Sequence, residues 1–452
     1  MTLLNELSAE VCQRARMSRD PRFDGRFFVA VKTTGIFCRP ICPANLPKEE
    51  NVEYFSSQAL AVSAGYRPCL RCRPESAPHS WAWKGAETTF LRALTLIEQG
   101  ELDGSLETLA SRLGISDRYL RQLFQRHLGM PPKQYAQIQQ LMFAKQLLHT
   151  SQISITEVAY ASGFQSTRRF NDAFQKLFRL TPTQVRRERA ALPSRNHLSL
   201  AFRGPFDWAH MLDFYRLRAI EGMELVDEQS YQRHFVLGEG TGWFKASMAQ
   251  SHLDIEFEME RLSDLRHLVV RLRRMFDLDA DLISIEAHLE QVAPGLVRRT
   301  GIRIPGVWNA WEAGVRAVLG QQVSVKAAIG QLNLLVSTLA ASEGSTRYFP
   351  TPEQVQMSDL SFLRMPERRK ETLKRLADYV RLHPMDSPMA WLSLSGIGPW
   401  TVDYAQLRGE SRSHCFLTGD LIVKKALAKF PQLTAESVAP WGSYATFHCW
   451  SH

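Results

Sequence analysis

The 452-residue sequence contains no unbroken run of about 20 apolar residues, the length that a membrane-spanning helix requires. Its N-terminus, MTLLNELSAEVCQRARM, has no continuous apolar stretch of the kind found in a signal peptide. Cysteine is scarce: the chain has seven, too few and too unevenly spaced for a disulfide-stabilised scaffold. These absences exclude a membrane span and a secreted disulfide-rich fold, and they predict a cytoplasmic protein in a reducing compartment.

What the sequence does contain is ordinary core-forming material and an uneven positive charge. Hydrophobic residues make up 44% of the chain, and three or four domains are expected because one core rarely serves more than ~250–300 residues. The net charge is +9, and residues 105–190 hold 13 Lys/Arg against 5 Asp/Glu. Such a concentration of positive charge favours a nucleic-acid-binding segment over a uniformly basic protein.

Four of the seven cysteines form two short pairs, Cys38-x3-Cys42 and Cys69-x2-Cys72. Each spacing lets one turn direct two sulfur atoms at the same ion, and four thiolates satisfy the tetrahedral coordination of zinc. The pattern therefore predicts one zinc ion bound by all four thiolates. Spacing alone favours a purely structural zinc, which is the usual role of four-cysteine sites.

Residues 20–74 resemble the N-terminal domain of the Ada protein family, through Gly35-Ile-Phe-Cys38-Arg-Pro-Ile-Cys42-Pro and Gly65-Tyr-Arg-Pro-Cys69-Leu-Arg-Cys72-Arg-Pro. The resemblance implies a small zinc-bound α+β domain. It also implies that Cys38 is both a ligand and a methyl acceptor, which takes a methyl group irreversibly from a DNA methylphosphotriester. A zinc-bound thiolate stays nucleophilic at neutral pH. Methylation of one sulfur removes a negative charge, which should strengthen binding to the phosphate backbone.

A layout of two helices separated by a glycine occurs twice in the basic segment. In the first copy, 106–124, apolar residues recur at three and four positions, Gly114 interrupts them, and Ser116 is a natural N-cap. The second copy, 155–174, has a glycine and a serine in matching places, and a lead-in helix is expected over 81–103. A generic helical hairpin is the alternative for either copy alone. Two matched copies carrying the basic excess favour DNA binding.

The pair resembles the AraC-type DNA-binding domain, through Ser105-Leu-Glu, Leu113-Gly, Val158-Ala and Gly163-Phe. The resemblance implies an all-α double helix-turn-helix domain on double-stranded promoter DNA, with recognition helices near 116–125 and 166–178. Arg179 stands where the family usually has glycine, so the end of the second recognition helix is expected to differ. The candidate groove or phosphate contacts are Arg118, Arg121, Arg168 and Arg169.

Residues 186–197 are charged and then carry Pro and Ser, as a linker does. In the Ada family this point leads to a second methyltransferase domain with a Pro-Cys-His-Arg active site. No such tetrapeptide occurs in the chain. Direct repair of alkylated guanine oxygen is therefore expected to be absent.

From residue 198 the hydrophobic pattern changes. An apolar run at 234–238 and strict alternation at 253–259 predict two strands, the second of them half-buried. Helical periodicity dominates from about residue 282 to the end. We therefore expect a small α+β domain followed by an all-α domain.

The most informative stretch of this half is Leu394-Ser-Gly-Ile-Gly-Pro-Trp400-Thr-Val-Asp-Tyr404, followed by Asp420. Two glycines turn the chain between helical segments, and Trp400 and Tyr404 lie one helical turn apart. An aspartate at such a place is most often a helix cap, and aromatic residues at this spacing are usually core. Turn, aromatic pair and acid together suggest a site that grips a DNA backbone and acts on a flipped base.

Residues 198–452 resemble the AlkA-type 3-methyladenine DNA glycosylases of the helix-hairpin-helix superfamily, through that stretch, Pro205-Phe-Asp-Trp208, Arg303-Ile-Pro-Gly-Val and Val318-Leu-Gly-Gln-Gln-Val-Ser-Val325. The resemblance implies that the hairpin presents backbone N–H groups, with a bound monovalent cation, to a DNA phosphate. It implies Asp420 as the catalytic aspartate. The base pocket that it implies consists of Trp400, Tyr404 and Trp450, with Phe214 added. The DNA contacts are Gln321, Gln322, Gly396, Gly398 and Thr401.

These residue types suit the reaction. An N-alkylated purine is cationic, so aromatic faces attract it, and it is already a good leaving group. One ionised carboxylate can then stabilise the oxocarbenium-like sugar and direct a water. Relatives that also cut the backbone carry a nucleophilic lysine at the position of Trp400, and tryptophan forms no Schiff base. We therefore predict a monofunctional glycosylase. Gln322 stands where the family often has an apolar wedge.

We hypothesise a bifunctional alkylation-response protein, in which methyl transfer to Cys38 triggers transcriptional activation and Asp420 serves the hydrolytic excision of 3-methyladenine-type bases. Its domains are expected at 1–80, 81–190, 198–283 and 284–452. The expected partners of this monomer, which is associated with the bacterial nucleoid, are damaged DNA, promoter DNA and RNA polymerase. Two alternatives stay open. One is a DNA-binding regulator with structural zinc and a non-catalytic glycosylase fold, and the other is a repair protein with no transcriptional role.

Overall fold

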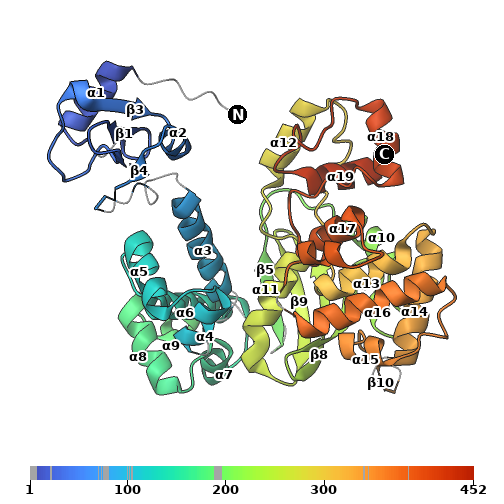
Figure 1. The fold of residues 1–452 in the computed structure, drawn as a ribbon. Helices are drawn as coiled ribbons and strands as arrows, with labels where there is room; N and C mark the ends of the chain where they lie inside the picture. The colour runs from blue at the N-terminus through green and yellow to red at the C-terminus, as the bar shows by residue number, and fades with distance from the viewer. Residues whose placement is uncertain are drawn as a thin grey trace. The chain divides into compact units, whose positions relative to one another are not determined.

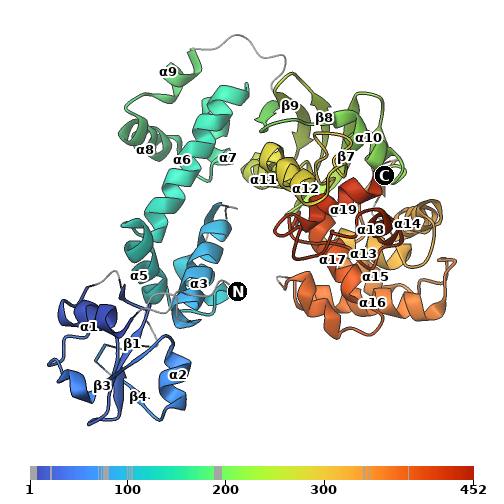
Figure 2. The same cartoon turned by 90° about the horizontal axis from the view of Figure 1, so that it is seen from above.

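The computed structural model describes residues 8–451, apart from 21–22, 70, 73, 75–80, 99, 101, 103–104, 188–195, 340–341, 345 and 385. The chain divides into two compact units, Met1–Gln139 and Gln140–His452. The boundary falls inside helix α6 (Pro132–Thr150), which Figures 1 and 2 draw as one continuous helix. Most of the expected linker, residues 188–195, lies outside the described part of the chain. The four-domain division expected from the sequence stays a proposal. Among the described residues, no helix is long and apolar enough to cross a membrane.

The first unit starts with a four-stranded sheet in the order β3-β1-β2-β4, in which only β2 and β4 pair in parallel. Successive side chains of a strand point to opposite faces, so Val29 packs with Cys12 of α1, whereas Phe28 and Ala30 pack with Ala61 of α2. A helix therefore covers each face, and the expected α+β domain is confirmed. Its elements are α1 (Ala9–Met17), β1 (Phe28–Val31), β2 (Ile36–Cys38), η2 (Glu49–Asn51), β3 (Val52–Phe55), α2 (Gln58–Ser63) and β4 (Arg67–Pro68).

Seven helices follow in the described part of the chain, and two of them begin at the serine caps expected from the sequence. The Ser116 hydroxyl accepts from the Tyr119 N–H at 3.2 Å, and Ser166 repeats this contact with Arg169 at 3.2 Å. The lead-in helix ends at Glu98, earlier than expected. The helices are α3 (Trp81–Glu98), α4 (Leu106–Arg112), α5 (Asp117–Leu128), α6, α7 (Ile155–Ala161), α8 (Thr167–Phe178) and α9 (Pro182–Arg187).

The end of α8 does not differ from that of α5, contrary to expectation. Gly129 ends α5 in the left-handed conformation at φ 68°, and Arg179 ends α8 in the same conformation at φ 60°. Each residue donates its backbone N–H to a carbonyl one turn back, Gln125 and Gln175 respectively. The cap hydrogen bond thus holds an arginine in a conformation that normally favours glycine.

The second unit contains an antiparallel five-stranded sheet in the order β5-β9-β8-β7-β6. Both predicted strands belong to it, and the central residues of β9 alternate between buried and more exposed, as expected. The predicted run at 234–238 is the second half of a longer strand that begins at Ser230. The elements are β5 (His197–Ala201), α10 (Trp208–Arg216), β6 (Glu224–Val226), β7 (Ser230–Leu237), β8 (Gly240–Met248), β9 (His252–Met259), η4 (Leu262–Asp264) and α11 (Leu265–Met275).

The rest of the second unit is helical, as predicted, except for the short pair β10–β11. Helix α13 is buried over most of its length and lies against α14, α16 and α17, while α12 packs with α18 and α19, which are far away in sequence (Figure 1). The elements are α12 (Leu282–Val292), α13 (Ala310–Gly320), α14 (Val325–Leu339), β10 (Ser342–Glu343), β11 (Thr346–Arg347), α15 (Pro352–Met357), α16 (Glu367–Leu382), η5 (Pro388–Ser393), α17 (Pro399–Gly409), α18 (Leu421–Lys429) and α19 (Gly442–Trp450).

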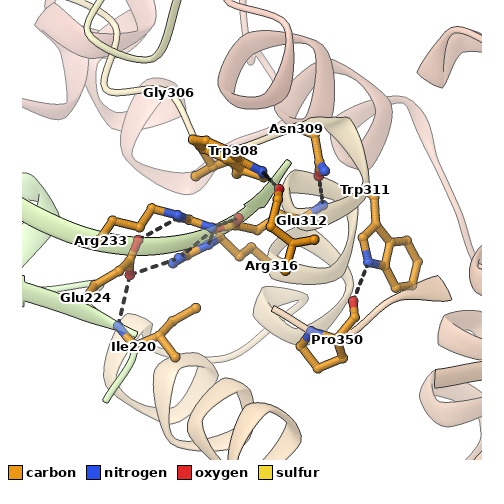
Figure 3. Close-up of polar contacts among 12 residues, drawn as sticks. Ile220, Glu224, Arg233, Gly306, Trp308, Asn309, Trp311, Glu312, Arg316 and Pro350 are labelled. Atoms are coloured by element: carbon orange, nitrogen blue, oxygen red, sulfur yellow. Dashed lines mark hydrogen bonds and ion pairs between the residues drawn. The ribbon is translucent and has the colours of Figure 1, made fainter. Parts of the chain in front are cut away.

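A buried ion cluster joins the sheet to α13 (Figure 3). Arg233 of β7 contacts Glu224 of β6 at 2.8 Å and Glu312 of α13 at 2.5 Å, and Arg316 contacts Glu312 at 2.8 Å and Glu224 at 3.2 Å. Burial raises the pKa of Glu312, but the charges of Arg233 and Arg316 outweigh it and bring the pKa to about 2. All four charges are thus present and mutually compensated inside the protein. The sequence pattern gave no sign of this cluster.

Glu312→Gln is expected to destabilise the second unit by about 3–5 kcal/mol, because it leaves two buried guanidiniums facing one carboxylate. Urea unfolding followed by tryptophan fluorescence measures this, since eight of the ten tryptophans lie in residues 140–452. The control is Glu239→Gln, whose ion pair with Arg261 is exposed and is expected to contribute almost nothing. Equal losses in the two variants would contradict a special role for the buried cluster.

Candidate functional site

The parallel pairing of β2 with β4 brings the two cysteine pairs together. Phe37 lies opposite Pro68, and the Cys69 N–H donates to the Phe37 carbonyl at 3.0 Å, so Cys69 lies beside Cys38 at the strand ends. The four sulfur atoms all lie within 4.8 Å of one another, and Cys42 is buried while the other three are partly exposed. The metal site predicted from the spacing is confirmed as a three-dimensional cluster.

The chemistry of this cluster fits a zinc ion. The hydrogen bond from Cys38 to Cys72, together with partial burial and the neighbouring sulfur atoms, raises the pKa of Cys38 far above its usual range. Accepting that bond lowers the pKa of Cys72 to about 6. Four sulfur donors this close together match the tetrahedral coordination of zinc, and a zinc ion among them would favour their thiolate forms.

Arg39 and Asp24 support the cluster from beside it, and neither was singled out from the sequence. The Arg39 backbone N–H donates to the Cys72 sulfur at 3.4 Å. Its guanidinium pairs with the buried carboxylate of Asp24, with Nε donating to Oδ1 at 2.8 Å. The position of Arg39 directly after Cys38 is the only sequence signal of this support.

The four arginines predicted for DNA contact lie on α5 and α8 and are exposed. Arg121 forms an exposed ion pair with Asp117 at 3.1 Å, which holds it weakly. Arg118 and Arg121 occupy the first two turns of α5, as Arg168 and Arg169 occupy the first turn of α8. Each pair therefore lies at the part of a recognition helix that usually contacts base edges or phosphates.

A groove of about 1140 Å³ lies in the second unit, where the loop after α13 meets the start of α17. It brings together residues from Gly320 to Leu421, about 100 positions apart in the sequence. The predicted site residues that line it are Gln321, Gln322, Gly396, Gly398, Trp400, Thr401 and Asp420. Gln322 at the wedge position is exposed and has a positive φ of 56°, so the loop presents it in a strained conformation.

The hairpin has the local features that its sequence predicts. Gly396 adopts φ +95°, Gly398 is the N-cap of α17, and Pro399 occupies the first helical position. The Gln321 side-chain amide donates to the Gly396 carbonyl and to the Thr401 hydroxyl, both at 3.2 Å. Gln321 thus ties the loop after α13 to the hairpin, so the two walls of the groove are joined at one end.

Gly396→Ala is expected to lower the free energy of unfolding by more than about 2 kcal/mol. A positive φ alone costs an L-residue ~1–2 kcal/mol, and the new Cβ would also overlap the Thr372 hydroxyl. Gly398→Ala is the matched control, because its φ is −112° and its Cβ would meet no atom within 4 Å. Urea unfolding of both variants measures the difference. Equal stability of the two would contradict the strained geometry.

Asp420 is half-buried and is the N-cap of α18. Its Oδ1 accepts from the backbone N–H groups of Ile422 at 2.9 Å and Val423 at 3.2 Å, and from the Trp450 indole N–H at 3.1 Å. Its Oδ2 has no hydrogen-bond partner among the described residues. The capping and catalytic interpretations of this aspartate are therefore compatible, since one oxygen caps the helix and the other is left for the groove.

The four aromatic residues form two stacked pairs. The Trp400 and Tyr404 rings lie 5.3 Å apart at 28°, and the Phe214 and Trp450 rings lie 6.2 Å apart at 15°. Only Trp400 among them lines the groove. Phe214 is buried, with the Arg218 guanidinium 3.7 Å from its ring centroid. Phe214 therefore supports the Trp450 ring from inside the protein and does not face the groove.

Two arginines that the sequence did not single out lie against these rings. Arg408 lies 4.7 Å from the Phe214 centroid and donates to the Tyr404 hydroxyl at 2.9 Å. Burial raises the pKa of Tyr404, but the charges of Arg408 and Arg218 lower it below its usual range. Burial itself lowers the pKa of Arg218 to about 10. The rings that would receive a cationic base are therefore already flanked by positive charge.

Three family descriptions match the chain: the metal binding domain of Ada over residues 11–75, a helix-turn-helix domain over 109–188 and the AlkA N-terminal domain over 197–309. A Mycobacterium tuberculosis protein described as a probable bifunctional transcriptional activator/DNA repair enzyme AlkA is 34% identical, covering 98% of this chain and 96% of that protein. The chain belongs to this bifunctional AlkA family.

Two further relatives each match part of this member of the bifunctional AlkA family. DNA-3-methyladenine glycosylase 2 of Escherichia coli is 32% identical, over 56% of this chain and 96% of that enzyme. The bifunctional transcriptional activator/DNA repair enzyme Ada of Escherichia coli is 35% identical, over 38% of this chain and 47% of that protein. The family resemblances stated from the sequence, and the multidomain fold class with them, are confirmed.

Proposed function

We propose that this bifunctional AlkA family protein repairs alkylated DNA at two independent sites and converts one repair event into transcriptional activation. The observation that carries the proposal is that both residue sets are complete on one chain. Four sulfur atoms cluster within 4.8 Å around Cys38, and Asp420 faces a groove that also contains the hairpin. The whole-chain likeness to a bifunctional relative supports both halves together.

At the first site, Cys38 acts as a methyl acceptor and is consumed. Its sulfur attacks the methyl carbon of a methylphosphotriester, the S–C bond forms, and the C–O bond breaks. The bonding electrons leave with the phosphate oxygen, so the DNA regains its phosphodiester charge. A zinc ion held by Cys38, Cys42, Cys69 and Cys72 would keep the attacking sulfur in its thiolate form. Because Cys38 is partly exposed and Cys42 is buried, Cys38 is the more accessible nucleophile of its pair.

Methylation of Cys38 changes the charge that this unit presents to DNA. Four thiolates and one divalent cation carry two net negative charges, and converting one thiolate to a thioether removes one of them. Weaker repulsion from the phosphates strengthens DNA binding. The helices α5 and α8 then hold promoter DNA through Arg118, Arg121, Arg168 and Arg169. RNA polymerase is recruited to a monomer of this protein in the bacterial cytoplasm, at the nucleoid.

At the second site, Asp420 removes N-alkylated purines by hydrolysis. Backbone N–H groups of Gly396 and Gly398 hold a DNA phosphate, where a monovalent cation held by the hairpin would add positive charge. Gln322 enters the gap left by the flipped nucleotide. The aromatic face of Trp400, which lines the groove, binds the cationic base, with Tyr404 stacked on Trp400 and Trp450 hydrogen-bonded to Asp420 completing the pocket. Oδ2 of Asp420 stabilises the positive charge that develops on the sugar and orients the attacking water. No lysine stands at position 400, so the backbone is not cut.

The experiment that tests the whole proposal uses one protein preparation and two substrates. DNA with a defined set of alkylated bases is assayed for free base, and DNA with methylphosphotriesters is assayed by mass spectrometry of the Cys38 peptide. Release of 3-methyladenine without strand cleavage and a gain of one methyl group on Cys38 are expected. No release and no gain would favour a regulator with structural zinc. Promoter binding that does not change on methylation would instead favour repair without regulation.

A further inference from the structure

Helix α16 carries two arginines into the groove without neutralising them. Arg368 and Arg369, in its first turn, both line the groove with the hairpin and Asp420. Within the described part of the chain, neither guanidinium has a hydrogen-bond or ion-pair partner. Among the described residues that line the groove, Asp420 is the only acid. Both arginines lie in the basic run Arg364-Met-Pro-Glu-Arg-Arg-Lys370, which has no motif of its own that points to DNA.

The other basic residues of α16 that form ion pairs do so with acids of the same helix. Lys370 contacts Glu367 at 3.4 Å, Arg375 contacts Glu371 at 2.7 Å, and Arg381 contacts Asp378 at 2.8 Å. These are surface pairs that need no ligand to explain them. Arg368 and Arg369 differ from them in facing the groove with their charge uncompensated. They therefore raise the positive potential of the groove wall.

The start of α16 is fixed to the hairpin that is proposed to hold a phosphate. The Thr372 hydroxyl donates to the Arg368 carbonyl at 2.9 Å, and its buried side chain packs against Gly396 with no room for an added Cβ. One turn further on, Arg375 donates to the Ser395 carbonyl at 3.1 Å. The two arginines and the hairpin therefore lie on one rigid wall. Their spacing is set by folding and not by DNA binding.

We propose that Arg368 and Arg369 bind a phosphodiester of the DNA backbone, separate from the phosphate at the hairpin. The groove then holds the damaged duplex at two backbone positions on the wall that also presents Trp400. A phosphodiester is the ligand that fits, because two adjacent guanidiniums offer forked donors and a full positive charge each. This inference rests on the proposed function, since it assumes that the groove receives damaged DNA.

The test is the salt dependence of base release from a duplex with one N7-methylguanine, under single turnover. The full chain is compared with the double variant Arg368→Ala/Arg369→Ala. The half-saturating DNA concentration is expected to rise on the order of tenfold. The slope of its logarithm against the logarithm of salt concentration is expected to fall by about 1, as for one lost phosphate contact. The rate at saturating DNA is expected to stay within about twofold, because neither residue touches the reacting atoms.

Two further variants separate a phosphate contact from net charge and from misfolding. Arg216→Ala/Arg381→Ala removes the same charge from two arginines that are paired with Asp213 and Asp378 and do not line the groove. This control is expected to leave the slope unchanged. Arg368→Lys/Arg369→Lys keeps both charges and is expected to restore the slope.

An unchanged slope in the first variant, or an equal change in the control, would overturn the inference while leaving the proposed function intact. A wild-type protein that releases no base would instead overturn the proposed function. Binding of the same duplex, measured by fluorescence anisotropy against salt, still tests the two arginines in that case. A difference in slope between wild type and the first variant alone would then support the contact.

Discussion

Replacing Asp420 by asparagine is expected to lower the rate of 3-methyladenine release by at least ~10²–10³-fold, the usual effect of removing one electrostatic group from a transition state. Asparagine keeps the shape of the side chain, and its oxygen can still accept from Ile422, Val423 and Trp450 as Oδ1 does. What it removes is the negative charge of Oδ2. The loss therefore reports on charge and not on the helix cap. Single-turnover release from alkylated DNA measures it.

The matched control is Asp281→Asn, because Asp281 is also an N-cap aspartate and does not line the groove. That variant is expected to release the base at the wild-type rate. The Asp420 variant is also expected to keep normal methyl transfer to Cys38, since the two sites belong to different units of the chain. If Asp420→Asn released 3-methyladenine at the wild-type rate, the assignment of Asp420 as catalytic would be wrong.

Cys38→Ser is expected to abolish methyl uptake from DNA methylphosphotriesters completely. A serine hydroxyl remains protonated at neutral pH and is a far weaker nucleophile than a thiolate, and it is also a poor ligand for zinc. Mass spectrometry of the protein after exposure to methylated DNA measures the effect. Transfer of the methyl group to another residue of this variant would contradict the assignment of Cys38.

Two controls distinguish the acceptor from the metal site. Cys12→Ala changes a buried cysteine of the same unit that lies outside the four-sulfur cluster, and it is expected to accept a methyl group normally. Cys42→Ala removes a ligand and keeps the acceptor, so it is expected to lose zinc and methyl uptake together. Both Cys38→Ser and Cys42→Ala are expected to release 3-methyladenine at the wild-type rate, because that reaction takes place in the other unit.

Features that depend on nearby residues were predictable from the sequence. Ser116 and Ser166 cap their helices because a serine hydroxyl reaches an N–H three residues on, whatever the rest of the chain does. The alternation of β9 follows from a sheet with one covered face. The cysteine spacing predicted a shared ion because each pair needs only one turn to aim its sulfurs.

Features that depend on distant residues were not predictable. The parallel pairing of β2 with β4, which places Cys69 beside Cys38, joins residues about 30 positions apart and leaves no local signal. The same holds for Arg408 of α17, whose guanidinium lies over the ring of Phe214 on α10, far away in the sequence. At Arg179 a local signal was present but gave a wrong prediction. A residue preference predicted a different helix end, and the cap hydrogen bond overrode it.

The three hydrogen bonds to Oδ1 of Asp420 fix the orientation of this carboxylate before DNA binds. A carboxylate on a free side chain must lose rotational freedom and shed oriented water before it can stabilise a charged sugar. Here those bonds form when α18 and α19 fold, so the free oxygen already has its direction before any DNA arrives. For the proposed reaction the reorganisation energy is expected to be small, because the folding of a helix end fixes the position of the Asp420 carboxylate.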